Sequence, residues 1–272
     1  MRQQSRLARL LASVAMAASF TAGLGGCQTM SDITGSITSK SDPVATAETD
    51  PRRAVDVYGE RYRANPKDPD AALAYGKALR SAGQRAQAVA VFEQATIAHP
   101  SNKALLAGFG RALVDNGNFQ QAFDVLSRAH SPDNPDWRIL SVQGTALDQL
   151  GRHDEARRYY ASALKIVPEE PSVLSNLGLS YVLSKDLPKA EEVLRRAYAS
   201  GRADTRVRQN LGLVVGLQGR FGEAETIVKA DLPADEAAAN VGYLKEMLSR
   251  KDNPRAGNGS IPVASFGDRR TE

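Results

Sequence analysis

The chain has 272 residues, a formal net charge of +4 and one cysteine. Its first 26 residues hold three arginines and no acidic residue, so the rest of the chain sets 32 Lys and Arg against 31 Asp and Glu, a net charge of about +1. This balance excludes the basic footprint that nucleic-acid binding requires, and a lone cysteine excludes an intramolecular disulfide.

Residues 1–26 form the first predicted segment. Three arginines make a positively charged start, an apolar stretch follows from Leu10 to Leu24, and small residues precede Cys27. This order is typical of a secretory signal. The apolar stretch is shorter than the roughly 20 residues that a membrane-spanning helix needs. We therefore predict a lipoprotein signal peptide, and a spanning anchor is the weaker alternative.

The cysteine stands in Leu24-Gly25-Gly26-Cys27, which resembles the bacterial lipobox. The resemblance implies that Cys27 becomes the first mature residue and carries acyl groups, and more than one acyl chain gives durable membrane anchoring. The alternative is an incidental cysteine beside an ordinary cleavage site. In such lipoproteins an aspartate after the cysteine favours inner-membrane retention, so Gln28 implies the outer membrane, with the protein facing the periplasm.

Two segments flank the middle of the chain and lack the apolar residues that a core needs. Residues 27–50 are rich in Ser and Thr, and residues 251–272 contain several Pro and Gly. Such segments bury too little surface to offset the entropy of ordering. We predict a flexible tether after the acylated cysteine and a disordered tail.

Between these segments the chain repeats itself every 34 residues. Each unit has a glycine, a large apolar residue three positions later, an alanine twelve positions after the glycine, and a second large residue four positions after the alanine. The glycines are Gly76, Gly110, Gly144, Gly178 and Gly212, and the alanines are Ala88, Ala122, Ala156, Ala190 and Ala224. Five copies in phase indicate a repeat architecture.

Both halves of each unit have apolar residues at helical spacing, which predicts two amphipathic helices. Further glycines, such as Gly83 and Gly117, fall where the first helix ends and the chain turns. The pattern resembles the tetratricopeptide repeat. That resemblance implies an all-α solenoid of about five and a half helix-turn-helix repeats plus a capping helix. Its units stack as a right-handed superhelix with a concave groove.

The repeat domain is predicted to span residues 51–250. Asp50-Pro51 has the form of an N-cap followed by proline, and the next residues are in phase with the second helix of a unit, so the array begins with half a repeat. At the other end Asp231 replaces an alanine and weakens the fifth repeat. Residues 235–250 carry an apolar stripe that predicts the capping helix.

The sequence offers little that indicates catalysis. His99, His130 and His153 fall at predicted helix ends, and no cysteine or second histidine stands at metal-ligand spacing. A Ser-x-x-Lys at Ser162–Lys165 lacks its partner motifs, and no phosphate loop or nucleotide fingerprint occurs. We predict no catalytic residues, cofactor, metal or small-molecule substrate. An enzyme with a site concealed by the repeats is the alternative, which hydrolase assays would reveal.

The family resemblance implies which first-helix positions line the groove. The lining becomes cationic toward the N-terminus and combines leucines with two asparagines, one repeat apart, toward the C-terminus. In related arrays such asparagines grip the backbone of an extended peptide, because an amide both donates and accepts; the alternative is plain solvation. The residues predicted to bind peptide are Lys77, Arg80, Arg111, Asn176, Leu179, Asn210 and Leu213. The implied lining also includes Ser141, Asp148, Ser175 and Val182.

The segment from Asp235 to Leu248 resembles the end of the TadD lipoproteins, which serve Flp (tight-adherence) pilus assembly, and the resemblance covers the whole mature chain. It implies a pilotin-like role in which the lipoprotein escorts or stabilises the outer-membrane secretin. The expected partners are a secretin or other pilus-assembly proteins, with the membrane held through the lipid. The alternative is a general periplasmic scaffold for outer-membrane or cell-wall assembly machinery.

Overall fold

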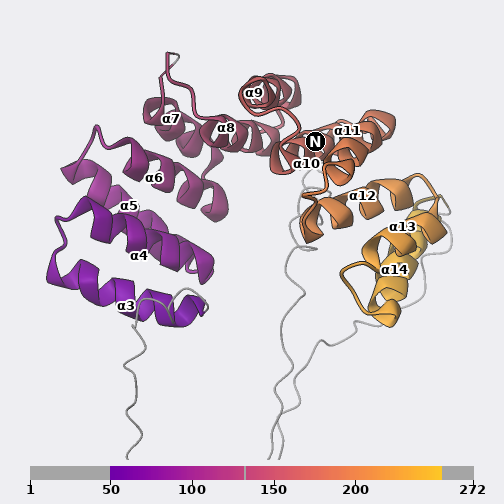
Figure 1. Cartoon of the computed structure of the whole chain (residues 1–272), viewed down its shortest axis with the longest axis horizontal. Coiled ribbons are helices and arrows are strands. Elements are labelled where there is room, and N and C mark those ends of the chain that lie inside the picture. The colour runs from indigo at the N-terminus through magenta and orange to yellow at the C-terminus, as the bar shows by residue number, and fades with distance from the viewer. Residues whose placement is uncertain (1–49, 132, 253–272) are drawn as a thin grey trace, which may run out of the picture. The chain divides into compact units, whose positions relative to one another are not determined.

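The computed structural model describes residues 50–131 and 133–252, and the regular structure in these ranges is helical (Figure 1). Apart from one isolated bridge between Ser131 and Asn134, these ranges contain no β-structure. The all-α prediction is therefore confirmed. The helices are α3 (Pro51–Ala64), α4 (Pro69–Ser81), α5 (Arg85–Ala98), α6 (Lys103–Asn116), α7 (Phe119–Ala129), α8 (Trp137–Gln149), α9 (His153–Ile166), α10 (Pro171–Leu183), α11 (Leu187–Ala199), α12 (Thr205–Leu217), α13 (Phe221–Val228) and α14 (Ala234–Asp252). The predicted signal peptide, Cys27, the tether before Asp50 and residues 253–272 of the tail lie outside the described residues.

The helices belong to two compact units. Unit 1 ends at Pro168 and contains α3 to α9, and unit 2 begins at Glu169 and contains α10 to α14. Within each unit, consecutive helices pack against each other. First helices of neighbouring repeats also touch, α4 with α6 and α6 with α8 in unit 1, and α10 with α12 in unit 2. In each unit the first helices thus form a shared surface.

Short polar side chains start α3 and most of the first helices. Asp50, Asp68 and Asp136 each accept a hydrogen bond from the backbone N–H two residues later, at 2.8–3.0 Å, and Asn102 accepts two at 3.1 Å. These bonds satisfy N–H groups that a helix start leaves without partners. Asp50 followed by proline confirms the predicted start of the leading half repeat.

A left-handed residue ends each first helix. Gly83, Gly117, Gly151 and Gly219 have φ between +74° and +86°, and the N–H of the following residue bonds back to the carbonyl five positions before it, as Gln84 does to Leu79 at 2.9 Å. This is the Schellman arrangement. In the fourth repeat a lysine, Lys185, takes the position with φ +66°.

The repeat glycines allow the two helices of a unit to approach closely. A Cβ added at Gly76 would lie 2.5 Å from the Phe92 ring, and one at Gly144 would lie 2.6 Å from the Tyr160 ring. Added Cβ atoms at Gly110, Gly178 and Gly212 meet the residue sixteen positions later at 2.4–2.6 Å. The large side chain of the second helix therefore fills the space that the glycine leaves.

Helix α14 closes unit 2. Ala237 and Val241 are buried in the same apolar cluster as Val214 and Val215, and a Cβ at Gly216 would meet Leu244 at 2.6 Å. The prediction of a capping helix over 235–250 is confirmed, with the observed helix slightly longer at both ends.

Asp231 has a structural task where the other repeats have alanine. Its carboxylate pairs with Arg208 through two guanidinium nitrogens, and Thr205 Oγ1 donates to it at 3.0 Å. These bonds hold the pKa of Asp231 below its usual value. The fifth repeat, whose second helix has only eight residues, thus gains an ion pair to α12 where it loses apolar packing.

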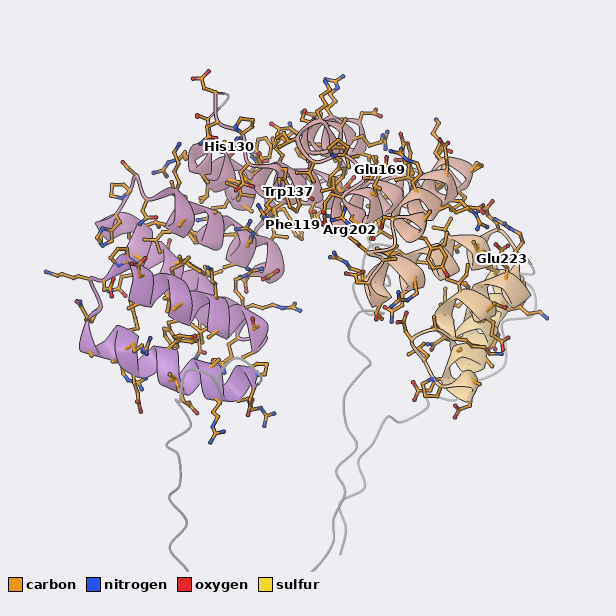
Figure 2. The ribbon with its side chains drawn as sticks, viewed as in Figure 1. Phe119, His130, Trp137, Glu169, Arg202 and Glu223 are labelled. Carbon is orange, nitrogen blue, oxygen red and sulfur yellow. The ribbon has the colours of Figure 1, made fainter. Side chains whose placement is uncertain are left out.

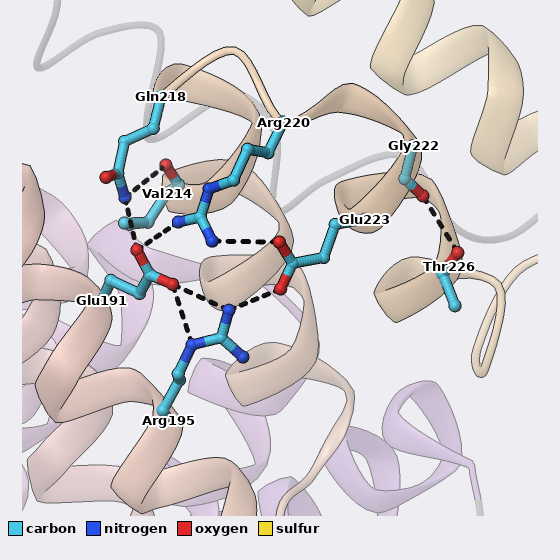
Figure 3. A network of polar contacts seen from close by, with 8 residues as sticks. All are labelled: Glu191, Arg195, Val214, Gln218, Arg220, Gly222, Glu223 and Thr226. Atoms are coloured by element: carbon cyan, nitrogen blue, oxygen red, sulfur yellow. Dashed lines mark hydrogen bonds and ion pairs between the residues drawn. The ribbon is translucent and has the colours of Figure 1, made fainter.

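The second helices of unit 2 are joined by a network of ion pairs (Figure 3). Glu191 and Arg195 on α11 alternate with Arg220 and Glu223 at the start of α13, and Gln218 Nε2 donates to Glu191 at 2.8 Å. Burial alone would raise the pKa of Glu191, but hydrogen bonds from Arg220 and two further donors outweigh it, so the pKa lies below its usual value. A network of this kind is worth more than isolated surface pairs.

Candidate protein-binding groove

The seven residues predicted to bind peptide all lie on first helices, three in unit 1 and four in unit 2. Lys77 is exposed and the other six are half-buried, so each retains some accessible surface. Because the structure describes two units, the seven residues form two separate sets. Each set is described by itself.

In unit 1 the first set begins at a hollow between α3 and α4. The hollow has a volume of about 520 Å³, a size found in small-molecule and peptide sites. Its α4 wall carries Asp70, Leu73, Lys77 and Ser81, which are groove-lining positions of the first full repeat, and Tyr58 comes from α3. The predicted groove position Lys77 therefore contributes to a real concavity.

Two arginines continue the cationic character of unit 1. Arg80 Nε donates to Asp115 Oδ2 at 2.6 Å across α4 and α6, so its charge is partly balanced. Arg111 on α6 is half-buried. Burial, and then the like charge of Arg80, holds the pKa of the Arg111 guanidinium below its usual value, and Arg138 on α8 acts in the same direction. Unit 1 therefore holds a cluster of cations that an anionic ligand would stabilise.

In unit 2 the second set combines amides with leucines. Asn210 Nδ2 on α12 donates to Ser175 Oγ on α10 at 2.8 Å, which ties neighbouring first helices together. An amide has two N–H groups and a carbonyl, so this bond occupies only part of its capacity. Leu179 and Leu213 are half-buried beside the amides. The surface suits a peptide that offers backbone groups and apolar side chains.

Several implied lining positions are wrong, because the structure buries them. Ser141, Asp148, Ser175 and Val182 are at most 8% exposed. Asp148 instead accepts a hydrogen bond from Tyr160 Oη at 2.9 Å, and His153 Nδ1 lies 2.9 Å from its other oxygen. The family positions do not distinguish long from short side chains, and short side chains at helix contacts become part of the packing.

The three histidines lie where the sequence predicts. His99 and His130 follow the last residues of α5 and α7, and His153 begins α9. Over residues 50–131 and 133–252, no three His, Cys, Asp or Glu side chains gather at metal-binding geometry. None of the helices in these ranges is both long enough and apolar enough to cross a bilayer.

Comparison with known families decides what the array is. Tetratricopeptide-repeat models match residues 45–108, 79–144 and 142–205, which together run over more than half of the chain. The chain belongs to the tetratricopeptide-repeat family. Proteins of this family are generally interaction scaffolds that bind protein partners, which is the coarse function that the groove also suggests.

Individual relatives extend the comparison. The cytochrome c-type biogenesis protein CycH of Bradyrhizobium diazoefficiens is 30% identical over 140 residues, which cover 50% of this chain and 37% of CycH. The crystal structure of PilW, a type IV pilus biogenesis factor, aligns with TM-score 0.63 and 18% identity over 73% of this chain and 93% of PilW. A chain of an APC/C hetero-tetramer aligns with TM-score 0.62 and 17% identity over 80% of this chain.

This chain thus spans little more than a third of CycH and 44% of the APC/C chain. At identities below 20%, the two structural likenesses show that the tetratricopeptide fold is shared. They give no information about which residues of this chain bind a partner.

The structure also shows residues that sequence reasoning missed. The tetratricopeptide array has a second hollow, of about 390 Å³, lined by Lys103 on α6 and by His130, Trp137 and Arg138 around the start of α8 (Figure 2). A signal was present in the sequence, because two prolines follow His130 within five residues. Prolines there predict that the preceding helix ends early.

Proposed function

We propose that this protein is an outer-membrane lipoprotein, anchored through Cys27, whose repeats hold a component of a pilus-assembly machine. The preferred partner is the secretin of an Flp (tight-adherence) system, or another component of that assembly, and the role is pilotin-like. The observation that carries the proposal is the surface that the first helices form in each unit. Those of unit 1 present cations, and those of unit 2 present amides with leucines, all with accessible surface.

The N-terminal sequence and the relatives support the setting. A signal-like segment followed by a lipobox-like Cys27 suits a protein held at a membrane with its repeats in the periplasm. PilW, which shares the fold over 93% of its length, is described as a pilus biogenesis factor. The segment from Asp235 to Leu248 adds the resemblance to TadD lipoproteins.

Lipidation is tested by labelling. The full-length protein should incorporate radiolabelled palmitate and fractionate with the outer membrane, and Cys27→Ser should abolish both. A palmitate signal that survives Cys27→Ser would contradict the anchor. Exchanging Gln28 for aspartate should move the protein to the inner membrane.

The partner is tested by affinity purification of the tagged full-length protein from detergent-solubilised outer membranes. The test variant carries Asn176→Ala and Asn210→Ala. Ser175→Ala is the matched control, because it removes the Asn210–Ser175 bond while leaving the amide in place. We expect the secretin to be recovered with the parent and the control and to be lost with the double variant.

The other outcomes are also informative. Secretin recovered with every variant keeps the role and moves the binding surface away from the asparagines. No secretin with any variant contradicts the pilus role. The alternative, a general periplasmic scaffold, then gains, and the similarity to CycH makes cytochrome c biogenesis proteins the first components to look for.

A further inference from the structure

In unit 1 the second helix of the second full repeat ends before its counterparts in the first and third repeats. Helix α7 has 11 residues and ends at Ala129, whereas α5 and α9 have 14 residues and end at Ala98 and Ile166. The 34-residue period places the end of α7 three residues later than it occurs. His130 is extended, with φ −138° and ψ 172°. A nearly complete helical turn is therefore missing, although the period continues undisturbed into α8.

The missing turn coincides with the second hollow of unit 1, of about 390 Å³, which we name the α7–α8 pocket. The small side chains of three alanines, Ala104, Ala107 and Ala129, line part of it, and Trp137 and Ile139 add apolar surface. Ala104 is exposed at a lining position that the family resemblance implies, whereas Ala107, at another such position, is buried. The pocket therefore borders the groove surface of α6, and its volume lies within the range of ligand sites.

The charge at the pocket favours an anionic ligand. Lys103 and Arg138 line it together with one carboxylate, that of Asp136, which accepts the backbone N–H of Arg138 at 2.8 Å and keeps its negative charge. Arg111 is close enough to Arg138 and Asp136 to interact with both. The cations therefore exceed the carboxylates that could balance them, which is the complementarity that steers and selects acidic partners.

Two side chains of the pocket are arranged for contact. Trp137 is half-buried, and the guanidinium of the exposed Arg138 lies 4.4 Å from the centroid of its indole, which is a cation–π contact. His130 Nε2 lies 3.1 Å from Oε1 of the buried Gln143, whose amide in turn donates to Ser127 Oγ. Because Gln143 Oε1 can only accept a hydrogen bond, His130 Nε2 carries the proton. His130 Nδ1 is buried and has no hydrogen-bond partner among the described residues.

From these observations we infer that the α7–α8 pocket receives one aromatic side chain of an extended partner segment whose neighbouring residues are aspartate or glutamate. The aromatic side chain enters between the alanines and Trp137, where offset stacking on the indole ring is favourable. The flanking carboxylates pair with Lys103 and Arg138. This inference rests on the proposed function, because it names the chemistry of the segment that a protein partner would insert.

The test is a selection from a random-peptide library displayed on phage, with the tagged full-length protein in detergent as the bait. The variant reverses both cations, Lys103→Glu and Arg138→Glu. The matched control is Arg85→Glu, a similar charge reversal at the first residue of the exposed start of α5. Circular dichroism verifies that the three proteins have equal helix content.

Trp137 supplies a second readout, because it is the only tryptophan in the chain. We expect the parent and Arg85→Glu to enrich peptides with an aromatic residue between acidic ones. Titrating such a peptide should shift the Trp137 emission saturably. The double reversal should weaken binding at least tenfold, and added salt should weaken the parent's binding.

Three results would overturn the inference. The first is enrichment of the same peptides by the parent and the reversed variant, and the second is no enrichment at all. The third is a Trp137 shift with phosphatidylglycerol vesicles and none with peptides, which assigns the pocket to a lipid surface. None of these decides whether the secretin is recovered in the affinity purification, so the pocket and the proposed function fail separately.

Discussion

The two units use one repeat pattern but expose different chemistry on their first helices. In unit 1 the predicted peptide-binding residues Lys77, Arg80 and Arg111 are charged, and two hollows open beside Lys77 and Trp137. In unit 2 the corresponding positions carry amides and leucines. The charged side chains that form its largest polar network are instead on the second helices, around Glu191.

The difference shows which positions carry the fold. Glycine, alanine and one large apolar side chain recur in both units and are almost fully buried, so packing fixes them. The groove positions contribute less to packing and are therefore able to vary from repeat to repeat. A repeat protein can change its partner in this way without changing its architecture.

The largest expected effect compares two repeat glycines. Gly144→Ala in unit 1 would push a Cβ to 2.6 Å from the ring of Tyr160, which a hydrogen bond holds in place, whereas Gly178→Ala in unit 2 would meet Leu194, which has alternative rotamers. We expect the free energy of unfolding to fall by about 3 kcal/mol and about 1 kcal/mol respectively, measured by urea denaturation.

The control for this pair is Gly222→Ala, where an added Cβ meets open space. It should change the free energy of unfolding by at most about 1 kcal/mol, in the stabilising direction, because alanine favours helix. Equal losses at Gly144 and Gly178 would contradict the role assigned to the fixed ring.

The next effect concerns the buried hydrogen bond between Tyr160 and Asp148 in unit 1. Tyr160→Phe removes the donor to Asp148 and leaves a buried carboxylate oxygen with one fewer bond. We expect a loss of about 2 kcal/mol in the free energy of unfolding. Combined with Asp148→Ala, the loss should be smaller than the sum of the two single losses, because the two side chains are coupled.

Tyr159→Phe is the control for this experiment, since Tyr159 is half-buried beside Phe123 and the substitution keeps the ring contact. It should change stability by less than about 0.5 kcal/mol. A double variant whose loss equals the sum of the single losses would show that the Tyr160–Asp148 bond is energetically unimportant.

A smaller effect tests the charge network of unit 2 through pH. The pKa of Glu191 is lower in the folded protein than its usual value of 4.5. Its stabilising contribution is therefore complete above pH 4.5 and is lost as the pH falls through the lower folded pKa. Glu191→Gln should lower the free energy of unfolding by about 1 kcal/mol at pH 7 and leave it unchanged once the pH is below the folded pKa of Glu191. The urea midpoints of the variant and the parent should therefore converge as the pH falls.

Glu192→Gln is the matched control, because Glu192 is exposed on the same helix. Its unfolding midpoint should follow that of the parent at every pH. If Glu191→Gln also follows the parent from neutral to acid pH, the network in Figure 3 contributes no stability.

The smallest effect concerns the turns between helices. Unit 1 has glycine at all three left-handed turn positions between the helices of its full repeats, whereas unit 2 has Lys185 with φ +66°. A residue with a side chain is strained there. Lys185→Gly should raise the free energy of unfolding by about 0.5 kcal/mol, because relief of strain exceeds the added chain entropy. Gly151→Lys should lower it by a similar or larger amount.

The sequence predicts those parts of the fold where only one type of residue fits the space or the backbone conformation. Only glycine fits where the Phe92 or Tyr160 ring crosses a first helix, and glycine is the cheapest residue for a left-handed turn. A period in such residues therefore predicts helices, turns and the half repeat together. The capping helix was predictable because its apolar stripe has no other place to be buried.

The site was less predictable, because its residues depend on neighbours that are distant in the sequence. Asp148 belongs to a groove position, yet Tyr160 and His153 draw it into the packing. From the sequence, Asp231 weakens the fifth repeat because it replaces an alanine, whereas in the structure it forms an ion pair with Arg208. Helix α7 ends early while the 34-residue period remains intact, so periodicity alone conceals the pocket.

The leading half repeat bears on how the protein responds to mechanical load. Helix α3 packs on α4, and only Ala54 and Gly59 among its residues are buried. Tension applied at Asp50 would thus act on the helix with the fewest buried side chains before it reaches the core around Phe92 and Leu113. Helix α3 would peel away first and lengthen the chain by about 30 Å, at about 2 Å gained per residue. Its loss would remove one wall of the α3–α4 hollow, while the core around Phe92 and Leu113 stays packed.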